Sequence, residues 1–79
     1  MVLDISKQDK KKLIEIGEKV RKLRKEKTKN NLKEMAKILS MDKKTYYRIE
    51  RGEGDYYITN LLKIAFYHEI SLAELFEGL

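Results

Sequence analysis

The stretch from Leu32 to Arg51 most constrains what this chain can fold into, because its pattern predicts two short helices joined by a tight turn. Met35, Ala36 and Leu39 recur at helical spacing and so share one face of the first helix. Asp42 follows the turn. Its carboxylate can accept the free backbone N–H groups at the start of a second helix.

The second of these helices is expected to have one buried and one exposed face. Tyr46 and Ile49 are three residues apart and are predicted to point inward. The outward face carries three cations and a phenol, namely Lys43, Lys44, Tyr47 and Arg48. Such a helix, placed just after a turn, suits the major groove of DNA, so we predict these four residues as base contacts. The alternatives are a phosphate contact for Lys43 or for Arg48 and a half-exposed aromatic ring for Tyr47.

Over roughly residues 13–77 the chain resembles the Cro/repressor-type (XRE) family of helix-turn-helix proteins. The residues that match the family motif are Met35, Ala36, Leu39, Ser40, Met41, Tyr46 and Ile49, followed by Glu50-Arg51-Gly52. The resemblance implies an all-α, five-helix, lambda-repressor-like DNA-binding domain. It also implies that Arg24 pairs with Glu50, which ties the first helix to the third.

The function that the resemblance implies is sequence-specific DNA binding by a transcriptional regulator. Such a repressor or controller protein binds a pseudo-palindromic operator as a homodimer. No ligand-binding domain is expected to follow, so the similar proteins are stand-alone members such as Cro-like repressors and controller proteins of restriction–modification systems.

The chain departs from the family pattern in several places, of which two bear most on DNA binding. Leu32 stands where the family has a Gln that touches phosphate, and Ser40 stands at the family's turn glycine. A left-handed backbone at Ser40 is therefore expected to be strained or avoided. Leu32 and the acidic loop after Gly52 favour an alternative function, in which the chain is an antitoxin or another protein-interaction module that uses the same fold.

Charge is divided unevenly along the chain, whose formal net charge is +5. Residues 1–51 carry seventeen Lys or Arg against eight Asp or Glu, a net +9, whereas residues 52–79 carry one against five, a net −4. This asymmetry points to a polyanion, here double-stranded DNA. The alternatives are a solvated lysine-rich surface or a membrane-surface helix.

Basic and amide side chains supply the candidates for phosphate binding. The exposed face of the first helix is predicted to carry Lys19, Arg21, Lys22, Lys25 and Lys27. A helix start near residue 31 also offers free backbone N–H groups. The predicted phosphate contacts are Lys22, Lys25, Asn30, Asn31, Lys33, Thr45 and Arg51.

Composition argues against an enzyme and against a membrane protein. The chain has no Cys and one His, so no cofactor or metal site is expected. His68 is instead predicted to be a packed core residue. No apolar run approaches the ~20 residues of a membrane span, and no signal peptide is visible, which fits a cytoplasmic protein.

Residues 1–6 are predicted to be a flexible arm, and residues 7–79 the helix-turn-helix domain. Asn31 with Glu34, and Ser71 with Glu74, have the spacing of capping boxes. A fourth helix is expected over about residues 59–69, with Leu61, Ile64, Ala65 and His68 inward. Gly17 within the first helix indicates close packing there.

Apolar residues near the carboxyl end point to self-association. The last helix is expected to have more apolar surface than so short an element can hide, which makes Phe66, Phe76 and Leu79 candidates for a dimer interface. Tyr46 is expected in the core with its hydroxyl reaching the rim.

Overall fold

The computed structural model describes residues 7–54 and 56–77, and over these residues it contains helices and no strand. The helices are α1 (Lys7–Lys27), α2 (Leu32–Ile38), α3 (Lys43–Arg51), α4 (Ile58–Tyr67) and α5 (Leu72–Leu75). The predicted all-α, five-helix fold is confirmed. The predicted arm 1–6 and Leu79 lie outside the described residues, so the proposed domain boundary stays a prediction.

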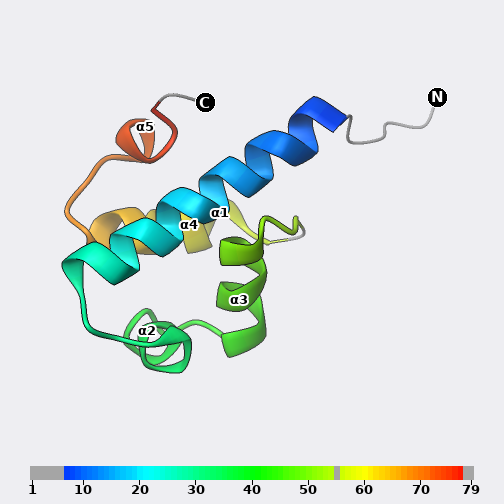
Figure 1. The fold of residues 1–79 in the computed structure, drawn as a ribbon. Helices are drawn as coiled ribbons and strands as arrows, with labels where there is room; N and C mark the ends of the chain where they lie inside the picture. Colours follow the sequence, from blue (N-terminus) through cyan, green and yellow to red (C-terminus); the bar gives the residue numbers. More distant parts are fainter. Residues whose placement is uncertain (1–6, 55, 78–79) are drawn as a thin grey trace.

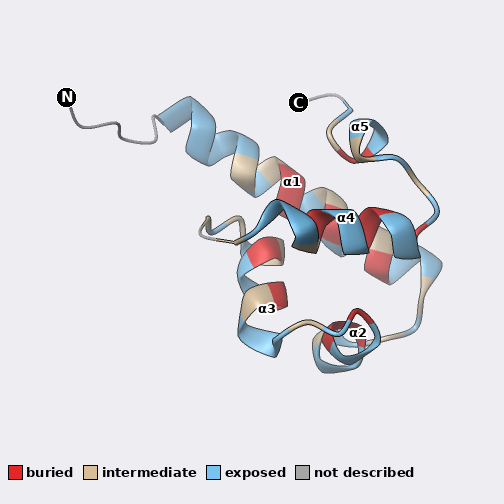
Figure 2. Ribbon diagram, turned by 180° about the vertical axis from the view of Figure 1, so that it is seen from behind, coloured by how far each residue is buried: buried red, intermediate tan, exposed pale blue. Residues whose placement is uncertain are grey.

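Helix α1 runs across the whole molecule, with α2 and α3 on one side of it and α5 on the other (Figure 1). The buried residues line the inner faces of the helices (Figure 2). The core cluster consists of Ile16, Val20, Met35, Ala36, Leu39, Tyr46, Ile49, Leu61, Ile64 and Leu75. The inward residues predicted for α4 are all buried, as expected.

Side-chain caps start three of the helices where the sequence places them. The Asn31 side chain accepts from the Glu34 backbone N–H at 2.8 Å, and the Glu34 carboxylate accepts from the Asn31 N–H at 2.9 Å. The same reciprocal box joins Ser71 to Glu74. Asp42 accepts from the N–H of Lys44 at 3.1 Å and so caps α3. Each satisfies backbone donors that would otherwise lack intrahelical partners.

The expectation that Ser40 avoids a left-handed backbone is wrong. Ser40 has φ 52°, and its N–H bonds to the Lys37 carbonyl while the next N–H, of Met41, bonds to Ala36 at 2.9 Å. These two bonds form a Schellman motif, and the free energy that they contribute offsets the steric cost of the left-handed conformation. The turn thus keeps the family geometry without glycine.

The same motif ends α4 two residues earlier than predicted. Glu69 has φ 58°, and the N–H of Ile70 bonds to the carbonyl of Ala65 at 3.0 Å. The helix therefore stops at Tyr67, and His68 caps it.

Helices α1 and α3 approach each other most closely at Gly17. A Cβ placed on Gly17 would lie 2.4 Å from the carbonyl oxygen of Ile49 and 2.6 Å from that of Glu50. No real Cβ tolerates such distances, so only glycine allows α3 to rest directly on the α1 backbone. The close packing predicted at this residue is confirmed.

Two polar groups in the core lack partners. The prediction that Tyr46 sends its hydroxyl to the rim is wrong: the residue is fully buried, and its hydroxyl has no hydrogen bond of good geometry among the described residues. Burial, and then the neighbouring Glu50 carboxylate, raise the pKa of Tyr46 above its ordinary value. His68 is buried as predicted, and its Nε2 has no partner in the described part of the chain. Burial, and then the charge of Lys27, lower the pKa of His68.

Helix α5 hides its apolar face better than the sequence suggests. Leu75 is fully buried, and Leu72 and Phe76 are half-buried against the core. The exposed apolar surface lies instead on α4, where Phe66 is 87% exposed and Leu62 is 46% exposed. The reason for placing a dimer interface on α5 is therefore weaker than the reason for placing one on α4.

Gly17→Ala is expected to destabilise the fold by at least about 2 kcal/mol, since the added methyl overpacks the contact between α1 and α3. This loss should exceed the ~1 kcal/mol that alanine gains in helix propensity. Urea unfolding measures the change in the free energy of unfolding. Gly54→Ala is the matched control, because a Cβ there meets only the Leu13 side chain at 3.5 Å. Equal stability of the two variants would contradict the packing argument.

His68 should make stability fall on acidification. Its folded-state pKa is lowered, so the unfolded chain binds more protons between that pKa and the ordinary value of about 6.5. The contribution of His68 to the free energy of unfolding is thus fully present above about pH 6.5, and it is lost as the pH falls toward the folded-state pKa. Urea unfolding at pH 7.5 and 5.5 should show a smaller drop for His68→Leu than for the unaltered chain. An identical drop in both would refute this role.

Candidate nucleic-acid interface

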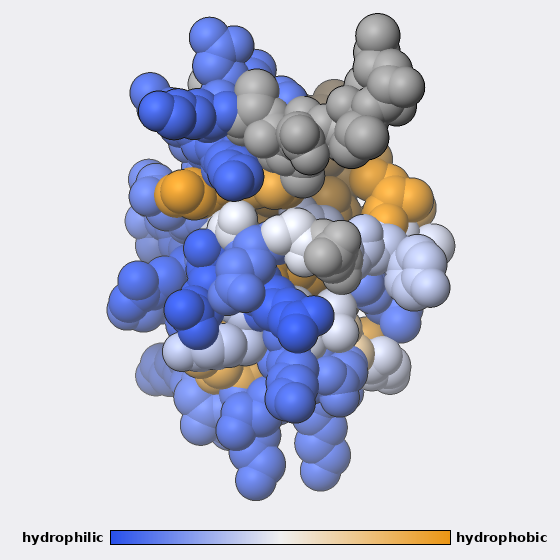
Figure 3. All heavy atoms as spheres, turned by 90° about the vertical axis from the view of Figure 1, so that its right-hand side faces the viewer, coloured by the Kyte–Doolittle hydropathy of each residue, from blue (hydrophilic) through white to orange (hydrophobic). Residues whose placement is uncertain are grey.

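The outward face of α3 carries the residues predicted to contact bases. Lys43, Lys44, Tyr47 and Arg48 are all exposed, whereas Tyr46 and Ile49 on the opposite face are buried. Asp42 fixes where the helix begins, and Gly52, with φ 78°, fixes where it ends. The side of the molecule on which α3 lies is largely hydrophilic (Figure 3). A rigid helix therefore presents the four predicted residues to solvent.

Two contacts at the end of α3 hold the Arg51 side chain, one with Tyr47 and one with Glu53. The guanidinium carbon of Arg51 lies 5.2 Å from the centre of the Tyr47 ring, within cation–π range. The Nε of Arg51 is also 3.3 Å from a carboxylate oxygen of Glu53, in the acidic loop. This ion pair is more than half exposed on the Arg51 side, so water weakens it. The sequence predicts a phosphate contact for Arg51 and indicates neither of these two contacts.

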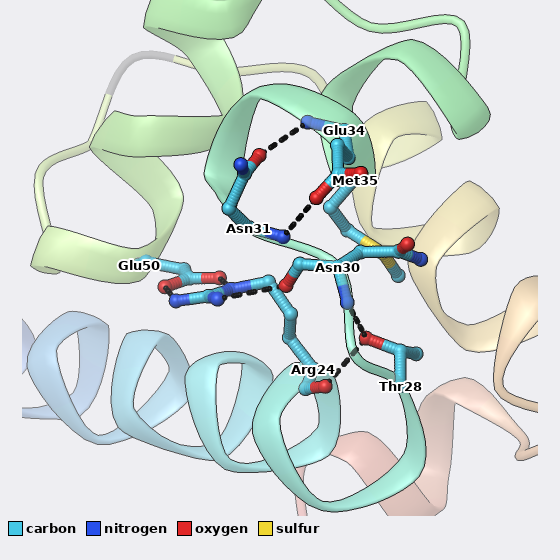
Figure 4. Close-up of polar contacts among 7 residues, drawn as sticks. All are labelled: Arg24, Thr28, Asn30, Asn31, Glu34, Met35 and Glu50. Carbon is cyan, nitrogen blue, oxygen red and sulfur yellow. Dashed lines mark hydrogen bonds and ion pairs between the residues drawn. The ribbon is translucent and has the colours of Figure 1, made fainter.

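A buried ion pair sets the position of α3. Arg24 Nε donates to Glu50 at 2.8 Å, and its Nη2 donates to the other carboxylate oxygen at 3.1 Å. The remaining amino group, Nη1, donates to the backbone carbonyl of Asn30 at 3.1 Å (Figure 4). The two side chains are only 10% and 5% exposed. The hydrogen bond to Glu50 is the main reason that the pKa of Arg24 is raised. The contact implied by the family resemblance is thus present.

The predicted phosphate residues divide into two groups. Lys22, Lys25 and Lys33 are exposed, and Thr45 is half-buried. Asn30 is turned inward, with its amide nitrogen 3.8 Å from the sulfur of Met35 (Figure 4). The Asn30 side chain is half-buried, and this weak contact engages part of its amide group.

Asn31 is also committed in part. Its side-chain oxygen accepts the capping bond from Glu34, so only its amide NH₂ remains for another partner. Of the two predicted asparagines, Asn31 is the more exposed.

Two lysines of the α1 surface do structural work that the sequence did not reveal. Lys19 Nζ donates to the carbonyls of Glu74 and Glu77 at the end of α5. Lys27 Nζ donates to the carbonyl of His68, at the end of α4, at 3.3 Å. Cations stabilise helix carboxyl ends by satisfying carbonyls and opposing the helix dipole. These two lysines thus join α1 to the last two helices.

Among the described residues, none of the helices has both the length and the apolar character that a membrane span requires.

The fold and the α3 face together define a small helix-turn-helix protein of the DNA-binding regulator class.

Comparison with known proteins narrows this class. The chain is 38% identical over 66 residues to the control protein C.MunI of a Mycoplasma species, and the match covers 84% of this chain and 89% of that protein. No family model matches the chain, and no solved structure matches it significantly. At this identity and coverage, the chain belongs to the control-protein family.

Breaking the buried pair should cost stability more than replacing it. Arg24→Met leaves the Glu50 carboxylate buried without its partner and is expected to cost about 3–5 kcal/mol in urea unfolding. The double variant Arg24→Met, Glu50→Met removes both charges and should recover most of that loss. A single-variant cost below about 1 kcal/mol would contradict the structural role given to this pair.

Proposed function

We propose that this chain is a transcriptional controller that binds a pseudo-palindromic operator as a homodimer in the cytoplasm. Membership of the control-protein family supports the regulatory role. The observation that carries the DNA-binding role is the exposed cationic face of a capped α3. The chain resembles controller proteins of restriction–modification systems, and we propose that the genes it regulates belong to such a system.

We propose that Arg48 reads a base. Its planar fork can donate two parallel hydrogen bonds to guanine O6 and N7, which a lysine matches only loosely. Lys43, Lys44 and the hydroxyl edge of Tyr47 lie on the same exposed face and would contact neighbouring bases or phosphates. Lys22, Lys25, Asn31 and Lys33 would then hold the backbone.

An exposed apolar surface on α4 supports the homodimer. Phe66 is 87% exposed and stands between two shallow grooves, one beside Ile38 and Tyr67 and the other beside Leu62 and Leu72. Contiguous apolar surface of this kind usually marks an interface. A second copy would cover it, and binding of a pseudo-palindromic operator would require the two α3 helices to lie one DNA turn, about 34 Å, apart.

The same surface favours a second candidate function, in which α4 binds a different protein, as an antitoxin does. Sedimentation separates the two. A homodimer at micromolar concentration supports the controller. A chain that stays monomeric at high micromolar concentration, with and without DNA, supports the protein-interaction module.

Arg48→Ala is expected to cost about 1–3 kcal/mol on the cognate duplex and to flatten preference at one base pair per half-site. Lys22→Ala is the control, because loss of a phosphate contact weakens cognate and scrambled DNA alike. Both variants are measured on both duplexes at one salt concentration. Equal losses on the two duplexes for Arg48→Ala would refute base readout.

Affinity should also depend steeply on salt. If each subunit neutralises roughly three to five phosphates, the log–log slope for the dimer should lie near −5 to −9. Titration of a labelled duplex between 50 and 300 mM salt, roughly spanning the physiological range, measures it. A slope near zero with an intact fold would mean that the basic surface is only solvated.

A further inference from the structure

A small pocket lies between α1 and the second half of α3. It is lined by Arg21, Arg24, Leu32, Tyr47, Glu50 and Arg51. Its inner wall is the buried Arg24–Glu50 pair, whose positions are fixed by the two hydrogen bonds that join them. The pocket is therefore part of the rigid contact between α1 and α3.

The residues that line this pocket carry a net positive charge. The carboxylate of Glu50 is fully engaged by Arg24, so these two charges offset each other. Arg21 and Arg51 are exposed and contribute the remaining positive charge from opposite helices. The ring of Tyr47, 5.2 Å from the Arg51 guanidinium, restricts where that group can go. Two exposed arginines that line one pocket from different helices suit a tetrahedral dianion or a phosphodiester oxygen pair.

The Leu32 side chain lines the same pocket and cannot donate a hydrogen bond. The charged side-chain donors that an anion would meet there are therefore the arginines. Glu53 already occupies one side of Arg51, at 3.3 Å, through an exposed pair that is easily exchanged. Glu53 thus stands where it would compete with an incoming anion.

We propose that this pocket binds one backbone phosphate of DNA, held by Arg21 and Arg51, and that Glu53 competes with that phosphate for Arg51. The proposal rests on the proposed DNA-binding function and adds a residue, Arg21, and a competitor, Glu53, to it. Tyr47 is then a positioning residue for Arg51 through its ring, and its exposed hydroxyl edge remains available to the groove.

The first experiment uses charge changes of opposite sign on the full chain and the best duplex selected from randomised DNA. Arg21→Gln should weaken binding about tenfold, as loss of a charge-assisted hydrogen bond does. Glu53→Gln should tighten binding about two- to fivefold, because it removes a weak competing pair. Lys10→Gln and Glu77→Gln carry the same charge changes at exposed sites outside the pocket. Thermal unfolding checks that each variant folds.

Effects of Arg21→Gln and Glu53→Gln no larger than those of their matched controls would overturn the proposal.

Arg21 and Arg51 are expected to act on one phosphate. The second experiment therefore replaces the operator phosphates one at a time by methylphosphonate.

At one phosphate in each half-site the unaltered chain should lose about tenfold in affinity, whereas the Arg21→Gln, Arg51→Gln double variant should lose less than about twofold. If the double variant stays as sensitive as the unaltered chain at every phosphate, the pocket does not hold one. Failure of the unaltered chain to bind any duplex would instead overturn the proposed function itself, so the two failures are distinguishable.

Discussion

The bidentate pair between Arg24 and Glu50 is the interaction on which the rest of the structure depends. One guanidinium joins α1 to α3 through Glu50 and joins both to the α1–α2 connection through the Asn30 carbonyl. Because the pair is buried, either charge alone would be costly, which makes the arrangement all-or-none. Gly17 complements it by letting the α3 backbone lie against α1 without a side chain between them. Together they set the angle at which the α3 surface faces solvent.

That geometry divides the cationic side chains into those that remain exposed and those that hold the fold together. The α3 face and the exposed lysines of α1 and α2 carry the cationic groups. Lys19 and Lys27 instead hold α5 and α4 by their carbonyl ends, so the basic face of α1 also fixes the carboxyl-terminal helices. Net charge alone would assign every lysine of α1 to DNA, and the hydrogen bonds show that two of them stabilise the fold.

Much of the fold could be predicted because its signals are local. The capping boxes of Asn31 and Ser71 and the Asp42 cap depend on residues two or three positions apart, so the sequence contains them whole. The left-handed turns at Ser40 and Glu69 could not be predicted from residue type, since neither is glycine and two backbone bonds decide their conformation. Contacts such as Lys19 with α5 and Lys27 with the end of α4 depend on helix packing, which no local pattern encodes. The half-buried position of Phe76 likewise depends on where α5 docks.

The most direct test of this account is selection from randomised duplex DNA followed by sequencing. If a capped, rigid α3 reads bases from each subunit of a dimer, the enriched sequences should share an inverted repeat with half-sites about 10 bp apart. Recovery of DNA with no shared motif, by a folded protein that still binds duplexes, would contradict the account. It would mean that the α3 surface holds phosphates and does not read sequence.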